Sequence, residues 1–335
     1  MDVEKYSGII RYIGKSIVKI VSLLIAVSIL SFILVSASPV DPIRAYIGEV
    51  GMANMSAENL AKLEAYFGLN IPPVQRYWNW FSDFVQGNMG SSLLYRQPVA
   101  DVIQVKFMNS MVLMTTAWMF SGILGFVLGI VAGLYRGHWI DKLIKGYSLL
   151  VASTPTFWLA LVLLMVFSVW LQILPIGLSV PIGVNAAEVT VFDNLKHLLL
   201  PALTLSVIGI ANITLHTREK MIDIMGEDYI LFAKARGKST VSIIRNHALR
   251  NIILPAITLQ FASISEIFGG SVLVEQVFSY PGLGKAAVSA GLSGDAPLLL
   301  GVAVISAALV FVGNLIANIL YGIIDPRIRR GSAYE

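Results

Sequence analysis

Long apolar runs alternate with short polar stretches along most of this chain. Six of these runs have about 20 residues or more, enough for a helix to cross a bilayer. They cover residues 17–37, 108–134, 146–174, 195–215, 252–274 and 298–324. The pattern predicts an all-α integral membrane protein with six transmembrane helices. We expect Pro155 to kink the third span and Gly269-Gly270 to interrupt the fifth.

The longest polar stretch, residues 38–105, follows the first predicted span. Ser56 is placed to cap a short helix with Glu58 in its first turn, and Gly68 is placed to end it. A further segment begins at Pro72-Pro73 and carries the aromatic residues Tyr77, Trp78, Trp80, Phe81 and Phe84. Such a cluster is typical of a small core or a membrane-interface belt. Contact with a ligand is the alternative.

Small residues recur at helical spacing in the second predicted span. Gly125, Gly129 and Gly133 lie four residues apart, and Gly122 precedes them. Small residues at this spacing let two helices approach closely in lipid. We therefore expect tight helix packing along this stripe.

Composition supports the membrane assignment, because 56% of the 335 residues are hydrophobic and only 13% are charged. The chain has no cysteine, which excludes disulfides and cysteine-based chemistry. Its four histidines lack the paired spacing of a metal site, and no phosphate-binding or hydrolase motif occurs. The sequence therefore predicts neither an enzyme nor a metal or cofactor bound by this chain.

The distribution of basic residues predicts a topology. With six spans, one side of the membrane receives 17 of the 24 Lys and Arg residues: four near the N-terminus, three after the second span, seven between Arg218 and Arg250, and three at the C-terminus. Basic loops face the cytoplasm. Both termini, 1–16 and 325–335, and the 218–250 loop are therefore expected to be cytoplasmic. The same rule accounts for the net charge of +4 without nucleic acid.

One acidic residue, Glu266, is placed well inside a predicted span. A carboxylate in hydrocarbon is costly, so Glu266 must face a cavity or a partner, or be protonated. Two interpretations stay open: a residue of a translocation pathway, or a hydrogen bond to a neighbouring helix.

The basic 218–250 loop is a charged island between apolar runs. Ala233 and Gly237 lie four residues apart, which predicts a small helical face that another protein can approach closely. Lys234, Arg236 and Lys238 surround this face and are placed to pair with acidic groups or lipid head groups.

The motifs of the chain resemble those of binding-protein-dependent ABC importer permeases, in the branch for dipeptides, oligopeptides and nickel. The resemblance covers nearly the whole chain and includes Asp228-Tyr229-Ile230, Ala233-Lys234-Ala235-Arg236-Gly237 and Leu254-Pro255; Pro39-Val40-Asp41-Pro42 and Phe67-Gly68-Leu69-Asn70; Gly87-Asn88-Met89-Gly90-Ser91-Ser92; Leu200-Pro201-Ala202-Leu203-Thr204; the stretch from Glu275 to Gly284; and Asp325-Pro326-Arg327. Leu231-Phe232-Ala233 stands where the general permease motif has Glu-Ala-Ala. Glu266 resembles what is expected of nickel-type permeases.

The resemblance implies a type I ABC importer permease fold in the plasma (inner) membrane, with an extracytoplasmic segment at 38–105 and a five-helix core at 106–324. The implied partners are a second homologous permease, two cytoplasmic ATPases that use ATP-Mg, and an extracytoplasmic solute-binding protein. The implied ATPase-coupling residues are Asp228, Ala233, Lys234, Arg236, Gly237, Leu254 and Pro255, and the implied outer-face contacts are Glu275, Pro281, Gly282 and Gly284. Peptides and nickel or metal chelates stay open as substrates. An ion-coupled secondary transporter without ATPases is the alternative function.

Overall fold

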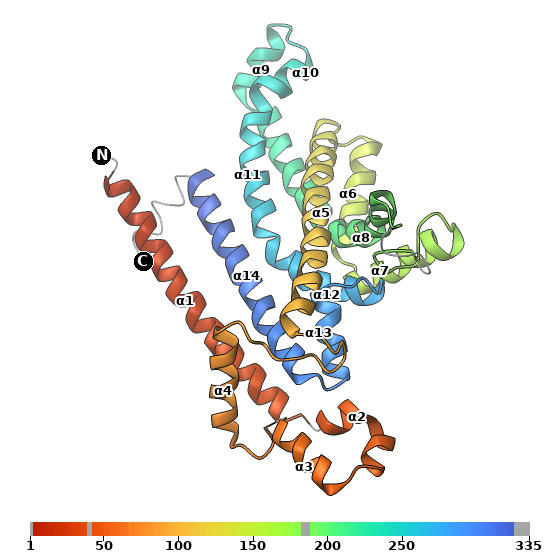
Figure 1. Ribbon diagram of the computed structural model, residues 1–335. Coiled ribbons are helices and arrows are strands. Elements are labelled where there is room, and N and C mark those ends of the chain that lie inside the picture. Colours follow the sequence, from red (N-terminus) through yellow and green to blue (C-terminus); the bar gives the residue numbers. More distant parts are fainter. Residues whose placement is uncertain (1–2, 39–41, 67, 182–187, 325–335) are drawn as a thin grey trace. The chain divides into compact units, whose positions relative to one another are not determined.

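The computed structural model describes residues 3–38, 42–66, 68–181 and 188–324 (Figure 1). The helices run in the order α1 (Val3–Ser36), α2 (Pro42–Ala53), α3 (Ala57–Tyr66), α4 (Pro73–Val85), α5 (Val99–Leu134), α6 (Trp139–Ala152), α7 (Thr156–Leu164), η1 (Met165–Trp170), α8 (Val191–Met225), α9 (Asp228–Ala235), α10 (Thr240–Ile243), η2 (Ile244–Ala248), α11 (Leu249–Ala262), α12 (Ile264–Val277), α13 (Leu283–Leu292) and α14 (Ala296–Ile324). The expected C-terminal segment 325–335, Phe67, and the Pro39-Val40-Asp41 motif lie outside the described residues.

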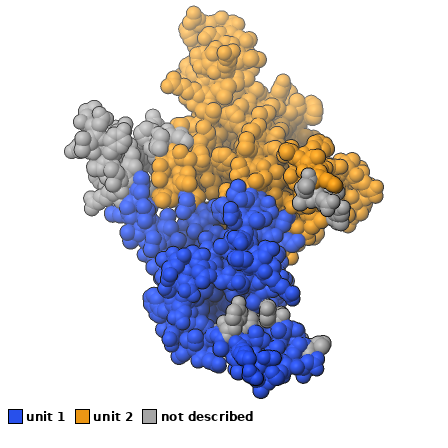
Figure 2. All heavy atoms as spheres, viewed as in Figure 1, with its two compact units in different colours: residues 1–110, 281–312 blue, residues 111–280, 313–335 orange. Residues whose placement is uncertain are grey.

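Contacts within the chain divide it into two compact units (Figure 2). Unit 1 comprises residues 1–110 and 281–312, and unit 2 comprises residues 111–280 and 313–335. Unit 1 therefore combines the first span, the polar segment after it and the 281–312 stretch. Helices α5 and α14 contribute residues to both units.

The described helices agree with six membrane crossings. Four are long and apolar enough to cross alone, in the ranges Ile13–Ser36, Val99–Leu134, Val191–Met225 and Ala296–Leu320. Two bent pairs supply the third and fifth crossings if each pair counts as one: Trp139–Ala152 with Thr156–Trp170, and Thr240–Ala262 with Ile264–Val277. The all-α, multi-span prediction is thus confirmed.

The third span is broken rather than kinked. Its two halves meet at 113°, and Pro155 precedes the second half with extended backbone angles. A proline disfavours helical geometry at the residue before it and cannot donate a backbone hydrogen bond. The hydroxyls of Ser153 and Thr154 both donate to the carbonyl of Leu150 and so satisfy the end of α6.

The expected interruption of the fifth span at Gly269-Gly270 is wrong. The 48° bend lies at Ser263, and both glycines are inside helix α12. The hydroxyl of Ser263 donates to the carbonyl of Gln260, an alternative to regular helix hydrogen bonding that often bends a helix. Gly270 instead provides room, because a Cβ there would lie 3.0 Å from Cδ1 of Leu205 on α8.

The glycine stripe of α5 packs against α8, as the spacing predicts. A Cβ at Gly125 would lie 3.0 Å from the carbonyl oxygen of Ile210, and one at Gly129 would lie 2.5 Å from Cβ of Thr217. The hydroxyl of Thr214 donates to the carbonyl of Gly125, 3.2 Å away. Helix α8 is therefore held at backbone distance from α5, and it forms the centre of unit 2.

Unit 1 has its own apolar core, formed where α5 begins and α13 and α14 meet. Its buried members are Val99, Val102, Ile103, Leu283, Ala286, Ala290, Leu298 and Val302. The carboxylate of buried Asp295 accepts hydrogen bonds from the Leu298 amide, the Leu94 amide and the Ser92 hydroxyl. It thus caps α14 and ties the 91–98 loop to it.

Helix α3 confirms the local signals in the polar segment. It begins after Ser56, whose hydroxyl oxygen accepts from the Asn59 amide at 3.3 Å. Beyond its end, Gly68 has a φ of 65°, in the left-handed region that glycine adopts without penalty.

Candidate functional site

The chain between α8 and α11 folds into a small subdomain, defined here as residues 221–252. It lies at the far end of the paired helices α8 and α11 (Figure 1). Its apolar core consists of Met221, Ile224, Ile230, Ala233, Ile243, Ala248 and Ile252. Because α8, α9, α10, η2 and α11 all contribute to this core, the 221–252 subdomain is packed onto the two membrane helices rather than tethered by flexible loops.

Helix α9 ends in a hydrogen-bonded glycine turn. The amide of Lys238 donates to the carbonyl of Ala233, the amide of Gly237 donates to that of Lys234, and Gly237 has a φ of 74°. This is a Schellman motif, in which glycine supplies the left-handed residue after the helix. The helical face predicted for Ala233 and Gly237 does not form, because α9 ends at Ala235 and Ala233 is buried in the chain's own core.

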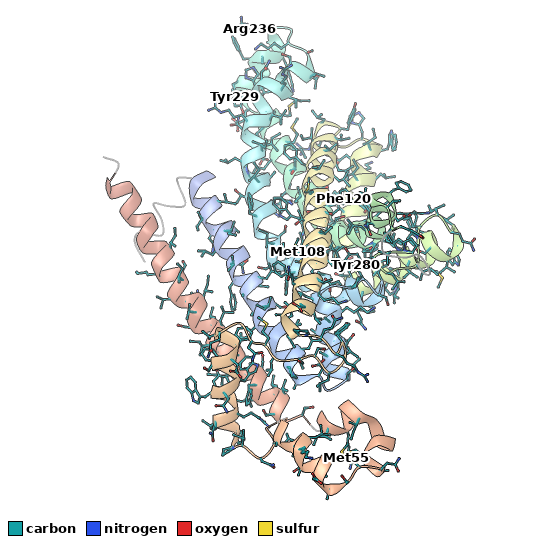
Figure 3. The ribbon with its side chains drawn as sticks, viewed as in Figure 1. Met55, Met108, Phe120, Tyr229, Arg236 and Tyr280 are labelled. Carbon is teal, nitrogen blue, oxygen red and sulfur yellow. The ribbon has the colours of Figure 1, made fainter. Side chains whose placement is uncertain are left out.

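The exposed side of α9 carries bulky side chains instead. Leu231 and Phe232 are 50% and 64% exposed, and the guanidinium carbon of Arg236 lies 5.7 Å from the centre of the Phe232 ring. Figure 3 shows Tyr229 and Arg236 near the tip of the subdomain, away from Tyr280. In the sequence, Leu231-Phe232 stands out only as a departure from a motif; the position of these residues three and four places after Asp228, at the helix start, was the available signal.

Polar contacts brace the base of α9. The amide of the Asn251 side chain donates to the Tyr229 hydroxyl at 3.1 Å and to the carbonyl of His247 at 3.2 Å. Nζ of Lys238 lies 3.3 Å from Nε2 of His247. Asp228 and Lys234 are exposed on α9, whereas Leu254 and Pro255 lie on α11, past Asn251. The predicted coupling residues therefore fall on α9, on the turn that follows it and on α11, and those of α11 lie away from the tip.

An ion pair that the sequence analysis missed joins α6 to α8 next to this subdomain. The carboxylate of Asp141 accepts from Nε and Nη2 of Arg218, at 2.5 and 2.8 Å, and from the Gly137 amide at 2.8 Å. The side chains of Asp141 and Arg218 are only 4% and 15% exposed. Asp141 is a single acid among the basic residues Arg136, Lys142 and Lys145, which was a weak signal for such a pair.

Glu266 lies in the first turn of α12, just past the bend at Ser263, and its side chain is exposed in the isolated chain. Among the described residues, no hydrogen bond joins its carboxylate to a neighbouring helix. A helix N-terminus stabilises a negative charge. An exposed carboxylate within a span must meet water, a cation or another subunit, so its position agrees with either a pathway or a subunit contact.

The predicted outer-face residues are mostly internal. Glu275, Gly282 and Gly284 are buried, and Pro281 is half-buried. Burial raises the pKa of Tyr280 to about 12, with a further contribution from the nearby charge of Glu275. Direct contact of Glu275, Gly282 or Gly284 with a protein partner does not fit this burial.

The turn after Tyr280 is held from within unit 1. The side-chain amide of Asn109 donates to the carbonyl of Pro281 at 3.0 Å, and the amide of Leu283 donates to the Ser110 hydroxyl at 2.8 Å. Pro281, Gly282 and Gly284 therefore shape the start of α13.

Two sequence profiles together match most of the chain. Residues 125–330 match the family described as "Binding-protein-dependent transport system inner membrane component", and residues 9–116 match its N-terminal counterpart. The chain belongs to this family. It is an ABC importer permease, a transporter subunit and not an enzyme. The alternative of an ion-coupled transporter has no support among these matches.

Characterised relatives are similar to this permease over nearly its whole length. An oligopeptide transport system permease protein of Bacillus subtilis, AppB, is 36% identical and the match covers 95% of this chain and 98% of AppB. The glutathione transport system permease protein GsiC of Escherichia coli K12 is 32% identical over 96% of this chain and 99% of GsiC. The di/tripeptide transport system permease protein DppB of Pseudomonas aeruginosa is also 32% identical, with 96% and 99% covered.

The fold of the permease matches a solved transporter structure. A chain of the MetNI methionine ABC transporter in an inward-facing conformation aligns with a TM-score of 0.53 at 15% identity, covering 67% of this chain and 96% of that one. Identity this low supports the fold alone. The type I ABC permease fold and the multi-pass membrane location are therefore established for the permease.

Proposed function

We propose that this permease is a membrane subunit of an ATP-driven importer of short peptides, and that the exposed side of α9 docks on a partner ATPase. The observation that carries the docking proposal is the bulky, exposed pair Leu231 and Phe232 on a helix that is anchored by the packed core of the 221–252 subdomain. Aromatic residues and arginine are enriched in protein interfaces, where they act as anchors in pockets of the partner. Phe232 and Arg236, which lie next to each other, are residues of these types.

The packing of the 221–252 subdomain provides a route for mechanical coupling. Force applied to α9 reaches α8 and α11 through the shared apolar core, and α8 is joined to α6 by the Asp141–Arg218 pair. Closure of two ATPases around ATP-Mg would then move these helices and shift the permease between two conformations. A ligand shifts such an equilibrium only by binding the two states with different affinity.

The complete importer in this proposal contains a second, homologous permease, two ATPases and an extracytoplasmic binding protein. The 218–250 loop and both termini face the cytoplasm, since most Lys and Arg residues lie on that side in a six-span topology. Residues 38–105 then lie on the opposite side. Of the four predicted outer-face residues, Pro281 is the one that retains exposed surface.

Substitution of Phe232 tests the docking proposal. Phe232→Glu places a charge in the proposed anchor and is expected to abolish peptide-stimulated ATP hydrolysis and co-purification of the ATPases. Phe232→Leu retains an apolar side chain and serves as the matched control, with expected activity within a few-fold of the native transporter. Normal coupled hydrolysis by the Phe232→Glu transporter would refute the docking role of α9.

Peptides are proposed as substrates because the three relatives compared above are named for oligopeptide, glutathione and di/tripeptide transport. Uptake by a deletion strain provides the test, with labelled di- and oligopeptides compared with labelled nickel, with and without a chelator. Loss of peptide uptake with normal nickel uptake is expected, and the native gene should restore it. Loss of nickel uptake alone would contradict the peptide proposal.

The exposed carboxylate of Glu266 favours a metal or metal-chelate importer as the second candidate. Glu266→Gln keeps the shape and removes the charge. If Glu266 lines a cationic pathway, this variant will reduce metal uptake and spare peptide uptake. Unchanged uptake of both would leave Glu266 with a structural role.

A further inference from the structure

Helix α4 packs along the second half of the first span, α1. The hydroxyls of Tyr77 and Ser28 lie 2.9 Å apart, and the ring of Phe32 lies 5.4 Å from that of Tyr77 and 6.3 Å from that of Trp80. Nη2 of Arg76 donates to the hydroxyl of Ser36 at 2.9 Å. These contacts fix the position of α4 along α1 from Ser28 to Ser36, and all of them lie within unit 1.

The charges of α1 set the depth of this contact in the bilayer. Lys15 and Lys19 mark one end of the span, so its uncharged part runs from residue 20 to Ser36. That part has about 17 residues and measures roughly 26 Å at 1.5 Å per residue. A hydrocarbon core of about 30 Å uses all of it. Ser28 therefore lies about 12 Å inside the Ser36 end of the span, and Tyr77 on α4 lies at the same depth.

One exposed face of α4, next to the face that contacts α1, is apolar. Val74, Trp78 and Val85 are 71%, 60% and 69% exposed, and with the half-buried Phe81 they form one stripe at helical spacing. The polar residues of α4 lie outside this stripe. Asn79 and Asp83 line a cavity of about 530 Å³ within unit 1, together with Ser36 and Asn88 among others.

We propose that α4 lies in the membrane, with the Val74–Trp78–Phe81–Val85 stripe in contact with the acyl chains of the leaflet at the Ser36 end of α1. Helix α4 has 13 residues, too few to span the bilayer. At this depth the neighbouring side chains of α1, Leu30 and Ile33, are also apolar and more than half exposed. The stripe therefore continues the lipid-facing surface of the span.

In this arrangement, part of the polar segment after α1 lies within the membrane. Residues 38–105 were expected to lie outside the membrane, whereas α4 would re-enter it as a short amphipathic helix. Asp83 avoids hydrocarbon in this arrangement because it faces the cavity rather than the lipid.

Cysteine labelling of the complete transporter in proteoliposomes tests the proposal. The chain has no native cysteine, so each variant introduces one thiol, and mass spectrometry of this chain's peptides excludes signals from partner subunits. Trp78→Cys is paired with its neighbour Asn79→Cys, and Val85→Cys with Gln86→Cys. A thiol in hydrocarbon stays protonated, so a charged maleimide should label the stripe roughly tenfold more slowly than the paired polar positions. Equal, fast labelling of both members of each pair would overturn the proposal.

A photoreactive phenylalanine analogue at position 78 distinguishes lipid from protein as the covering partner. Irradiation in the membrane is expected to give lipid adducts on the peptide that contains residue 78, and few at position 79. Crosslinks from position 78 to another subunit would overturn the lipid assignment and make the stripe a subunit interface. Both substituted positions are exposed, so normal ATP hydrolysis by the variants serves as the check of folding.

Discussion

The first and fourth spans, α1 and α8, are both apolar membrane helices, but they differ in how much of their surface is buried within the chain. Only 11% of the most apolar window of α1 is buried inside the chain, compared with 67% for α8. Helix α8 carries glycine-mediated contacts, an ion pair and part of the 221–252 core. Helix α1 packs against α4, and most of its large apolar side chains are exposed.

The difference shows that an apolar sequence is enough to put a helix in the membrane but does not by itself make the helix pack against other helices. Between two apolar helices in lipid the hydrophobic effect is weak, so close packing and polar contacts decide which helices associate. Helix α8 has both kinds of contact. We therefore expect substitutions to be costly along α8 and mild along α1, and the following variants test that contrast.

Loss of the Asp141–Arg218 pair should have the largest effect. Asp141→Asn leaves the Arg218 charge enclosed without its counter-ion, which typically destabilises a protein by about 3 kcal/mol. We expect a lower thermal unfolding temperature and a lower yield of assembled transporter. Asp223→Asn on α8 is the control, because its pair with Lys220 is exposed at 3.7 Å and such pairs contribute little. Equal unfolding temperatures for the two variants would contradict the importance given to the buried pair.

Overpacking of the glycine stripe should rank second. At Gly129 a side chain would collide with Thr217 and with the carbonyl of Thr214, whereas Gly14 on α1 has open space around it. Gly129→Leu should cost about 1–3 kcal/mol or more as α5 and α8 separate, and Gly14→Leu should leave stability unchanged. Detergent-solubilised yield and thermal unfolding of the two variants give the measurement. A stable Gly129→Leu permease would mean that α5 and α8 are not held at backbone distance.

Removal of the hydroxyl of Tyr77 should have the smallest effect. Tyr77→Phe keeps the ring contact with Phe32 and removes only the hydrogen bond to Ser28. One such bond contributes about 1 kcal/mol. We expect a small fall in unfolding temperature and unchanged transport, with Ser22→Ala on α1, whose hydroxyl bonds only its own helix, as the control. A large loss of stability would indicate that α4 anchors α1 more firmly than its few contacts suggest.

Much of the fold was readable from local signals. Run length gave the spans, the spacing of Gly125, Gly129 and Gly133 gave the packing stripe, and Ser56 and Gly68 bounded α3. The position of the bend in the fifth span was harder to predict. Gly269 and Gly270 both stay helical, Gly270 lies against Leu205 of α8, and Ser263 bends the chain instead.

At the candidate site, too, the sequence predicted the location better than the roles of individual residues. The basic 218–250 loop identified where the 221–252 subdomain lies, and the motifs identified the family. The roles of Ala233 and Gly237 were read as one small docking face, since spacing alone cannot tell an inward small residue from an outward one. In the folded subdomain Ala233 is core and Gly237 terminates the helix.

The membrane class, the six apolar runs and the family follow from the amino-acid sequence alone, because they depend on composition and on motifs that are local in the chain. The exposed side of α9, the pairing of Asp141 with Arg218 and the packing of α4 along α1 became visible only in the folded chain. Those features join residues that are far apart in sequence. Their geometry depends on how closely helices approach, which no single segment specifies.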